Sequence, residues 1–127
     1  MLDGVTLDTG ALIALERKEA RMRRAIAEAR AAHRVVSVPS VVLIEWWRDA
    51  PRQRSILAGL EIAPLDERIA KAAGAAVGAV TGATTVDAAV MAHAALRDDV
   101  VWTSDVDDML RLQAHFPGVR VFSVSGR

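Results

Sequence analysis

The chain has 127 residues, which suits a single domain over residues 1–127 and leaves no room for two. Its 16 Lys and Arg residues balance 16 Asp and Glu residues, which argues against a protein that binds nucleic acid simply by being basic. The absence of cysteine excludes disulfides and thiolate metal sites, and 3 histidines argue against a multi-histidine zinc site. No stretch has the pattern of a signal peptide or a membrane span, so we expect a cytoplasmic protein.

Short runs rich in β-branched residues alternate with helical patterns along the chain. The expected strands cover residues 5–7, 34–38, 60–63, 100–103 and 119–122. The expected helices cover residues 9–16, 17–33, 40–49, a short stretch from Pro51, 66–80, 84–97 and 105–115, with Ser40 and Asp66 as N-caps. Because strands and helices alternate, the sequence predicts an α/β fold with a mostly parallel five-stranded sheet covered on both faces.

Acidic residues follow the expected strands or lie in the helices between them. Asp8 comes directly after the first strand, and Asp105 follows the fourth. Asp87 lies in the first turn of helix 84–97, which is apolar nearly all round and should be largely buried. Glu45 lies among aliphatic residues, on a face that we expect to be partly buried. Because ligands of such folds bind beyond the carboxyl ends of the strands, these acids mark a candidate site.

Each of these residues also has a purely structural interpretation. A side chain near a helix N-terminus can cap the helix or complement its dipole, which applies to Asp8, Asp87, Ser104, Asp105, Asp107 and Asp108. Glu45 is harder to explain in this way, because a carboxylate among aliphatic residues is costly unless it is paired. Arg48, one helical turn further along, is its candidate partner.

The acids together favour a metal site. Four or more carboxylates in one cleft would repel one another strongly. Mg²⁺ or Mn²⁺ would relieve that repulsion, because hard divalent cations prefer carboxylate and water oxygens and need no histidine or cysteine. Such a site can lower the pKa of a bound water molecule and neutralise a phosphoryl oxygen. The chemistry best served is therefore hydrolysis of a phosphodiester bond by a metal-activated water.

Four segments resemble, in order and spacing, the motifs of PIN domains, particularly those of the VapC-type toxins. They are residues 7–12 (LDTGAL), 40–45 (SVVLIE), 85–94 (TVDAAVMAHA) and 101–110 (VWTSDVDDML). The resemblance extends over essentially the whole chain and implies a three-layer α/β/α sandwich with strand order 3-2-1-4-5. It also implies a Mg²⁺- or Mn²⁺-dependent endoribonuclease that hydrolyses RNA and is neutralised by a cognate antitoxin protein, as the toxin of a type II toxin–antitoxin pair.

The resemblance also assigns roles to individual residues. The catalytic and metal-binding acids would be Asp8, Glu45, Asp87 and Asp105, with Asp108 as a further metal ligand. Thr9 and Ser104 match small hydroxyl positions beside the metal, whereas Asp107 is less clearly a position of this family. The pair Trp46–Trp47 is bulkier than the motif implies, which affects the expected shape of the groove around Glu45.

Residues outside the acidic set suggest how RNA and protein partners would bind. Arg48, Arg52 and Arg54 follow Glu45 closely and are candidates for contact with RNA phosphates. Trp46 and Trp47 are adjacent in the sequence, so one should pack inside and the other nearer the surface. The outer one could contact an antitoxin, a second subunit or a base. The resemblance is the main reason to expect both an antitoxin and a homodimer.

Two other functions compete with this interpretation. A catalytically inactive PIN-like module would bind RNA or protein without cleaving, although the complete set of acids argues against it. A phosphoryl-transfer or signalling domain on a similar sheet would need a lysine at a late strand end. Lys18 and Lys71 both lie in expected helices, which disfavours that second alternative.

Overall fold

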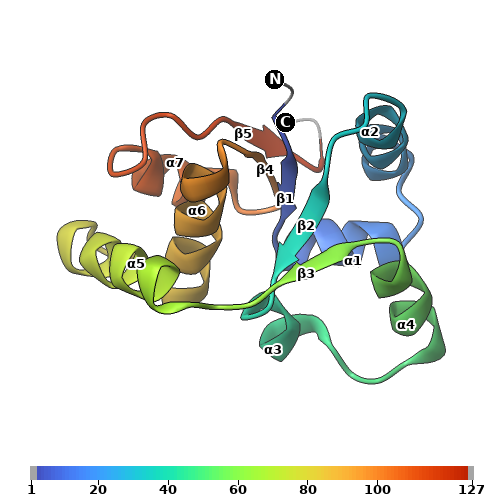
Figure 1. The fold of residues 1–127 in the computed structure, drawn as a ribbon, viewed down its shortest axis with the longest axis horizontal. Helices are drawn as coiled ribbons and strands as arrows, with labels where there is room; N and C mark the ends of the chain where they lie inside the picture. The colour runs from blue at the N-terminus through green and yellow to red at the C-terminus, as the bar shows by residue number, and fades with distance from the viewer. Residues whose placement is uncertain (1–2, 126–127) are drawn as a thin grey trace.

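The computed structural model describes residues 3–125 and contains a five-stranded sheet with helices between the strands (Figure 1). The strands are β1 (Val5–Leu7), β2 (Val36–Pro39), β3 (Glu61–Ala63), β4 (Val100–Thr103) and β5 (Val121–Ser123). The helices are α1 (Thr9–Glu16), α2 (Ala20–Ala31), α3 (Val42–Trp46), α4 (Pro51–Ala58), α5 (Glu67–Ala79), α6 (Thr85–Arg97) and α7 (Val106–Gln113). Neighbouring strands are parallel in the order β3-β2-β1-β4-β5, so the predicted α/β fold and strand order are confirmed.

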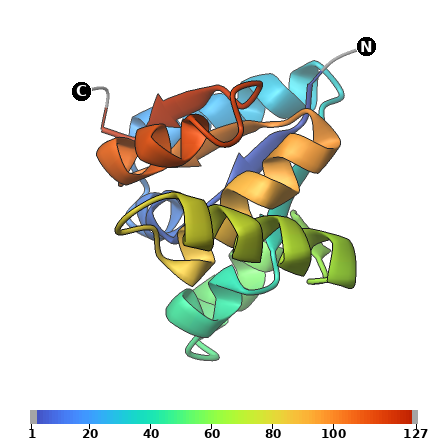
Figure 2. The ribbon, with the colours of Figure 1, turned by 90° about the vertical axis from the view of Figure 1, so that its left-hand side faces the viewer.

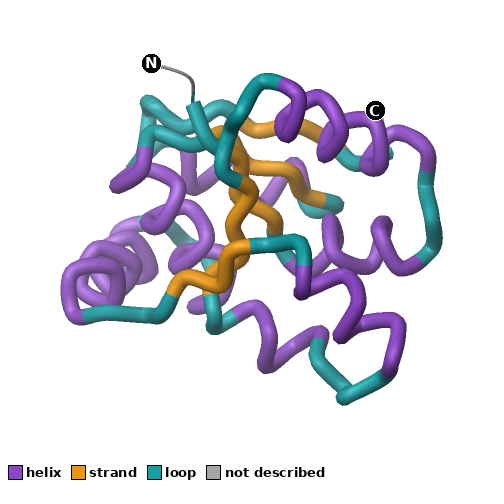
Figure 3. The backbone as a smooth tube through the Cα atoms, turned by 45° about the vertical axis from the view of Figure 1, so that its right-hand side comes forward, coloured by secondary structure: helices purple, strands orange, loops and turns teal. Residues whose placement is uncertain are grey.

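Helices cover both faces of the sheet and give the molecule three layers. In Figure 1, α5, α6 and α7 lie on one side of the strands, whereas α1, α2 and α4 lie on the other. Figure 3 shows the strands at the centre, with helices around them. Every residue of β1 and β2 is buried, as expected for parallel strands covered on both faces.

Helix α6 packs against the sheet and carries the candidate acid Asp87 at its start. Seven consecutive residues, Ala88 to Ala94, are buried, and α5 packs across this helix (Figure 2). Thr84 is the N-cap, and its hydroxyl oxygen accepts a hydrogen bond from Asp87 N at 3.1 Å. His93 Nε2 lies 2.9 Å from Ser37 Oγ in the core, which fits a structural role. The prediction of a largely buried helix over 84–97 is therefore confirmed.

The segment that carries Glu45 differs from the prediction of one helix over 40–49. Helix α3 has five residues, and Ser40 is not its N-cap, because Ser40 Oγ instead accepts a hydrogen bond from Leu65 N at 3.1 Å. The chain leaves α3 in an extended conformation at Trp47, with ψ of 130°. Trp46 is buried and Trp47 is half-buried, so the predicted division between an inner and an outer tryptophan is confirmed.

The predicted helix 17–33 is also shorter than expected. Lys18 has a φ of +58°, a left-handed conformation that separates α1 from α2 and delays the start of α2 to Ala20. His33 has the same φ of +58° just beyond the other end of α2. Within residues 3–125, none of the helices has both the length and the apolar character that crossing a bilayer requires.

Candidate metal centre

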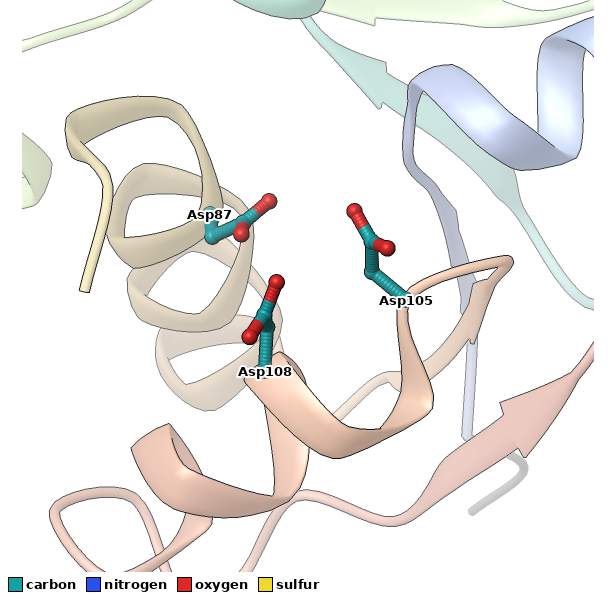
Figure 4. A group of neighbouring side chains, drawn as sticks. All are labelled: Asp87, Asp105 and Asp108. Carbon is teal, nitrogen blue, oxygen red and sulfur yellow. The ribbon is translucent and has the colours of Figure 1, made fainter. Parts of the chain in front are cut away.

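Three aspartates converge beyond the carboxyl end of β4. Asp87 comes from the first turn of α6, Asp105 is the N-cap of α7, and Asp108 lies in the first turn of α7. Each offers a carboxylate oxygen, and these three oxygens lie within 4.8 Å of one another. Figure 4 shows the three carboxylates pointing toward a common space. We call these three residues the acidic cluster.

Asp8 lies at the carboxyl end of β1, the strand that pairs with β4. Leu7 is in register with Trp102, and Asp8 N donates to Trp102 O at 3.3 Å. Asp8 is 5% exposed and caps α1, because its Oδ1 accepts a hydrogen bond from Ala11 N at 2.9 Å. The structural interpretation of Asp8 as a cap is therefore confirmed, and its position beside the acidic cluster makes a second role compatible with the first.

Burial and like charges raise the pKa values of two acids in this region. Desolvation by burial raises the pKa of Asp8 to about 6, hydrogen bonds with Thr103 and Ala11 oppose the rise, and Asp87 and Asp105 add to it. The pKa of Asp87 is also raised, first by burial and then, against a hydrogen bond with Thr84, by neighbouring carboxylates, including that of Glu45. The five predicted acids therefore lie close enough for their charges to interact.

Glu45 reaches this region from α3 and is held there by a residue of α1. Thr9 Oγ1 donates a hydrogen bond of 2.5 Å to Glu45 Oε1, so the residue after Asp8 is tied directly to Glu45. The expected partly buried face is wrong, because Glu45 is exposed. Its expected pairing with Arg48 is wrong as well, because the Arg48 guanidinium donates to the carbonyl oxygens of Ile44 and Trp47.

Two residues that sequence reasoning did not single out hold the site together. Thr103 Oγ1 accepts a hydrogen bond from Asp105 N at 2.8 Å, and the same side chain bonds to Asp8. A Cβ atom on Gly10 would lie 1.9 Å from Ser104 Oγ and 2.9 Å from Ser104 N, so only glycine allows α1 to approach this loop. Thr103 and Gly10 both lie inside the motif segments, so their place in those segments is the feature of the sequence that points to them.

The remaining predicted residues lie outside the acidic cluster. Asp107 is exposed, and its carboxylate is not part of the cluster. Arg52 donates to Leu15 O and Glu16 O at the C-terminal end of α1, the opposite end from Asp8. Arg54 forms an ion pair of 2.6 Å with Asp49. Ser104 is exposed in the loop before Asp105, next to Gly10.

The donor atoms of the acidic cluster suit Mg²⁺ or Mn²⁺. All three side chains offer carboxylate oxygens, which such hard cations prefer over nitrogen or sulfur. Because their oxygens lie within 4.8 Å of one another, the three side chains would be able to share one ion. Asp108 Oδ1 also pairs with Arg111 Nη2 at 3.0 Å, so Asp108 would either offer its second oxygen to an ion or exchange Arg111 for it.

The sequence matches no family model and no curated protein, whereas several solved structures share its fold. A chain of DNA-bound VapBC from Salmonella typhimurium has a TM-score of 0.71 and 22% identity, over 97% of this chain and 99% of that chain. A chain of VapBC2 from Rickettsia felis, bound to a promoter DNA fragment, has a TM-score of 0.75 and 14% identity, over 94% and 97%. A chain of a toxin–antitoxin complex from Klebsiella pneumoniae has a TM-score of 0.72 and 20% identity, over 95% and 98%.

These likenesses show that the chain has, over nearly its whole length, a fold found in VapBC toxin–antitoxin complexes. The resemblance to VapC-type PIN domains is thereby confirmed at the level of the fold. At identities of 14% to 22%, these likenesses show only the fold, so the function has to be inferred from the residues of the site.

Proposed function

We propose that this protein is a Mg²⁺- or Mn²⁺-dependent endoribonuclease and the toxin of a type II toxin–antitoxin pair, acting in the cytoplasm. The observation that carries the proposal is the convergence of three carboxylate oxygens within 4.8 Å of one another, beside the buried Asp8. Carboxylates held this close repel one another, and a divalent cation is the partner that would relieve the repulsion. The likeness to chains of VapBC complexes supports the toxin role.

In this proposal, Asp87, Asp105 and Asp108 hold the cation, and Asp8 and Glu45 complete the catalytic group. A bound cation would supply a water molecule of lowered pKa and would neutralise charge on a phosphate oxygen. Without a cation, burial raises the pKa of Asp8 to about 6, and a cation bound beside it would favour its ionised form. Thr9 holds Glu45 beside this group through its hydrogen bond of 2.5 Å. Ser104 would support the metal from the loop that it shares with Asp105.

The proposed partners are an antitoxin protein, a second copy of the chain, and RNA. Ile44 on α3 is 77% exposed and Leu65 is 49% exposed, and we place these two aliphatic side chains in the surface that the antitoxin would cover. Arg48, Arg52 and Arg54 remain candidates for contact with RNA phosphates. All three are exposed, although their guanidinium groups also bind carbonyl oxygens of their own chain.

The decisive experiment compares Asp87→Asn and Asp105→Asn with a matched control, Asp107→Asn. Asp107 lies in the same first turn of α7 as Asp108, is exposed, and lies outside the acidic cluster, so its variant removes one charge without removing a ligand. We expect the wild type to cut single-stranded RNA with Mg²⁺ or Mn²⁺ and to be inactive with a chelator. Cleavage should disappear in Asp87→Asn and Asp105→Asn and remain in Asp107→Asn.

Two results would contradict the proposal. RNA cleavage that persists in both cluster variants would place the active site elsewhere. Calorimetry that finds no Mn²⁺ binding to the wild type, together with no cleavage, would favour the inactive RNA- or protein-binding module. The toxin role has its own test, because expression of the wild type, and not of Asp105→Asn, should arrest the growth of host cells.

A further inference from the structure

A second polar groove lies away from the acidic cluster and has the opposite charge. It has a volume of about 600 Å³ and lies between α2 and the part of the sheet formed by β1, β4 and β5. Its charged and aromatic lining residues are Arg21, Glu28, Arg34, Trp102, Arg120 and Phe122. We call it the Arg–aromatic groove. Three guanidinium groups line it with the carboxylate of Glu28, and Asp3 pairs with Arg120 at 3.1 Å, so three positive charges face two negative ones and the region stays positive.

Two of the arginines lie over the two aromatic rings, which form one stacked pair. The Trp102 and Phe122 rings are stacked with centroids 5.3 Å apart. Arg21 Cζ lies 5.4 Å from the centre of the Trp102 ring, and Arg120 Cζ lies 6.0 Å from that of Phe122. Such cation–π contacts orient a guanidinium plane without using its N–H donors. In the contacts that the structure describes, Arg21 uses Nε, which donates to Ser123 O at 2.9 Å.

The third arginine has a donor that the protein itself does not satisfy. Among residues 3–125, Arg34 Nε is a buried side-chain nitrogen without a hydrogen-bond partner. A buried donor left unpaired costs free energy, and the cost is greater for a charged group. Because this nitrogen is buried, an anionic ligand would supply the missing acceptor only after the Arg34 side chain turned toward the groove, whereas it would directly neutralise part of the charge of the other two arginines.

We infer that the Arg–aromatic groove binds single-stranded RNA, with phosphates on the arginines and a base against Phe122. Guanidinium groups bind phosphate through paired N–H donors, and any base can stack on an aromatic ring. Phe122 is 37% exposed, and a base would stack on its ring by displacing Arg120, which lies over it. An acidic peptide would satisfy the charges and would make no use of the rings. The choice of RNA rests on the proposed function, whereas the charges and rings do not depend on it.

The groove and the acidic cluster lie toward opposite ends of the same strands, because Val5, Val100 and Arg120 line the groove at or before strand starts. Trp102 immediately precedes Thr103 in β4, and Thr103 bonds to Asp105 of the acidic cluster. The groove and the cluster are therefore linked by one short strand, although successive side chains of a strand point to opposite faces. A single RNA strand that contacts both would be anchored on one face of the sheet and presented to the acids at the strand ends.

Binding is measured without cleavage, by fluorescence anisotropy of a short labelled single-stranded RNA with the Asp105→Asn chain in a metal chelator. The test variant adds Arg21→Ala and Arg120→Ala. The matched control adds Arg23→Ala and Arg24→Ala, which remove the same charge from α2 at exposed positions outside the groove. We expect the groove variant to bind about tenfold more weakly, with a salt dependence smaller by about 1.4 in logarithmic slope, and the control to bind nearly normally.

A second variant, Phe122→Ala, tests the stacking and leaves the charge unchanged. It should also weaken binding about tenfold, and Phe122→Leu replaces it if the alanine variant unfolds. Equal losses in the groove and control variants would overturn the inference, since binding would then follow total charge. Polyglutamate that competes as well as unlabelled RNA would overturn it too, in favour of an acidic peptide.

The outcomes also separate this inference from the proposed function. If the wild type cleaves RNA with Mg²⁺ and the groove variants bind RNA normally, the groove inference fails and the proposed function stands. If the wild type never cleaves, and the groove variants still lose RNA binding relative to the control, the proposed function fails and the groove stands.

Discussion

Two buried aspartates at opposite ends of the sheet have the same exposure and different surroundings. Asp8 follows the carboxyl end of β1 and Asp99 precedes β4, and each is 5% exposed. Burial is the first cause of a raised pKa at both. Asp99 accepts a hydrogen bond from Thr6 Oγ1 at 2.8 Å and lies 3.6 Å from Arg97 Nε. Both aspartates have a hydroxyl partner and like charges nearby, but at Asp99 the cation Arg97 opposes those like charges, whereas at Asp8 the charges of Asp87 and Asp105 are opposed by hydrogen bonds alone.

The difference separates a structural carboxylate from one that is available for function. The chain offsets the burial of Asp99 with its own cation, Arg97, in addition to a hydroxyl such as Asp8 also has. At Asp8 the chain gathers further negative charge, which costs stability unless a cation from outside is bound. Perturbed acids of this second kind are typical of functional sites. Four substitutions test whether the two aspartates differ in this way.

The largest effect on stability is expected from Asp8→Asn in the absence of metal. Because folding raises the pKa of Asp8, protonation of this residue stabilises the fold fully below about pH 4. That stabilisation is lost as the pH rises through about 6. At about pH 8 the wild type therefore contains a costly buried carboxylate, and we expect the variant to unfold with a free energy about 2 to 3 kcal/mol higher. The two chains should converge near about pH 4. Urea unfolding in a chelator at both pH values measures this difference.

The exposed Asp107→Asn serves as the control for Asp8→Asn and should change stability by less than about 0.5 kcal/mol. Added Mg²⁺ should reverse the order, because it would stabilise the wild type by mass action more than the variant. If the Asp8→Asn chain were less stable than the wild type at about pH 8 without metal, the charge of Asp8 would be compensated within the fold as fully as the charge of Asp99.

Gly10→Ala should have the largest effect on activity among substitutions that leave every acid in place. The new Cβ would lie 1.9 Å from Ser104 Oγ, so the loop that carries Asp105 has to move. Displacement of a catalytic group by about 1 Å can cost about a hundredfold in rate, which is the expected loss in RNA cleavage. Gly74→Ala is the control, because a Cβ on that helical glycine meets nothing within 4 Å. Cleavage at the wild-type rate in Gly10→Ala would contradict a rigid site.

The sequence predicted the sheet order and the positions of the acids better than the contacts that hold them. Asp8 and Asp105 follow strands, and strand ends are easy to locate from β-branched runs, so their approach followed from the fold. The hydrogen bond between Thr9 and Glu45 joins residues 36 positions apart, and the extended residue Trp47 that ends α3 early interrupts the helical pattern of the sequence. The contact of Gly10 with Ser104 joins residues that are 94 positions apart, and no local pattern encodes it.

Thr103→Val tests whether the hydroxyl between Asp8 and Asp105 positions both acids. The valine side chain keeps the shape and loses the acceptor for Asp105 N and the bond to Asp8. Loss of a residue that orients metal ligands typically costs 10- to 100-fold, so we expect about a thirtyfold loss in Mn²⁺ affinity and in RNA cleavage. Thr103→Ser should restore most of both. A valine variant that binds Mn²⁺ normally would show that the backbone alone positions these acids.

Thr6→Val makes the corresponding change at the other end of the sheet, and here we expect the smallest effect. It removes the hydroxyl that donates to Asp99, so a buried carboxylate loses a hydrogen bond that favours its ionised form. The free energy of unfolding should fall by about 1.5 kcal/mol near neutral pH. The loss should shrink in acid, where Asp99 becomes protonated and depends less on that donor.

Mn²⁺ affinity and RNA cleavage should stay at wild-type values in Thr6→Val, because Asp99 holds the strands and takes no part in the chemistry. Calorimetry, a cleavage assay and urea unfolding on the same preparation measure all three quantities. If Thr6→Val lost cleavage while its stability stayed unchanged, Asp99 would belong to the functional site, and the two ends of the sheet would no longer differ in kind. Loss of stability alone would show that one fold uses buried aspartate for two separate purposes.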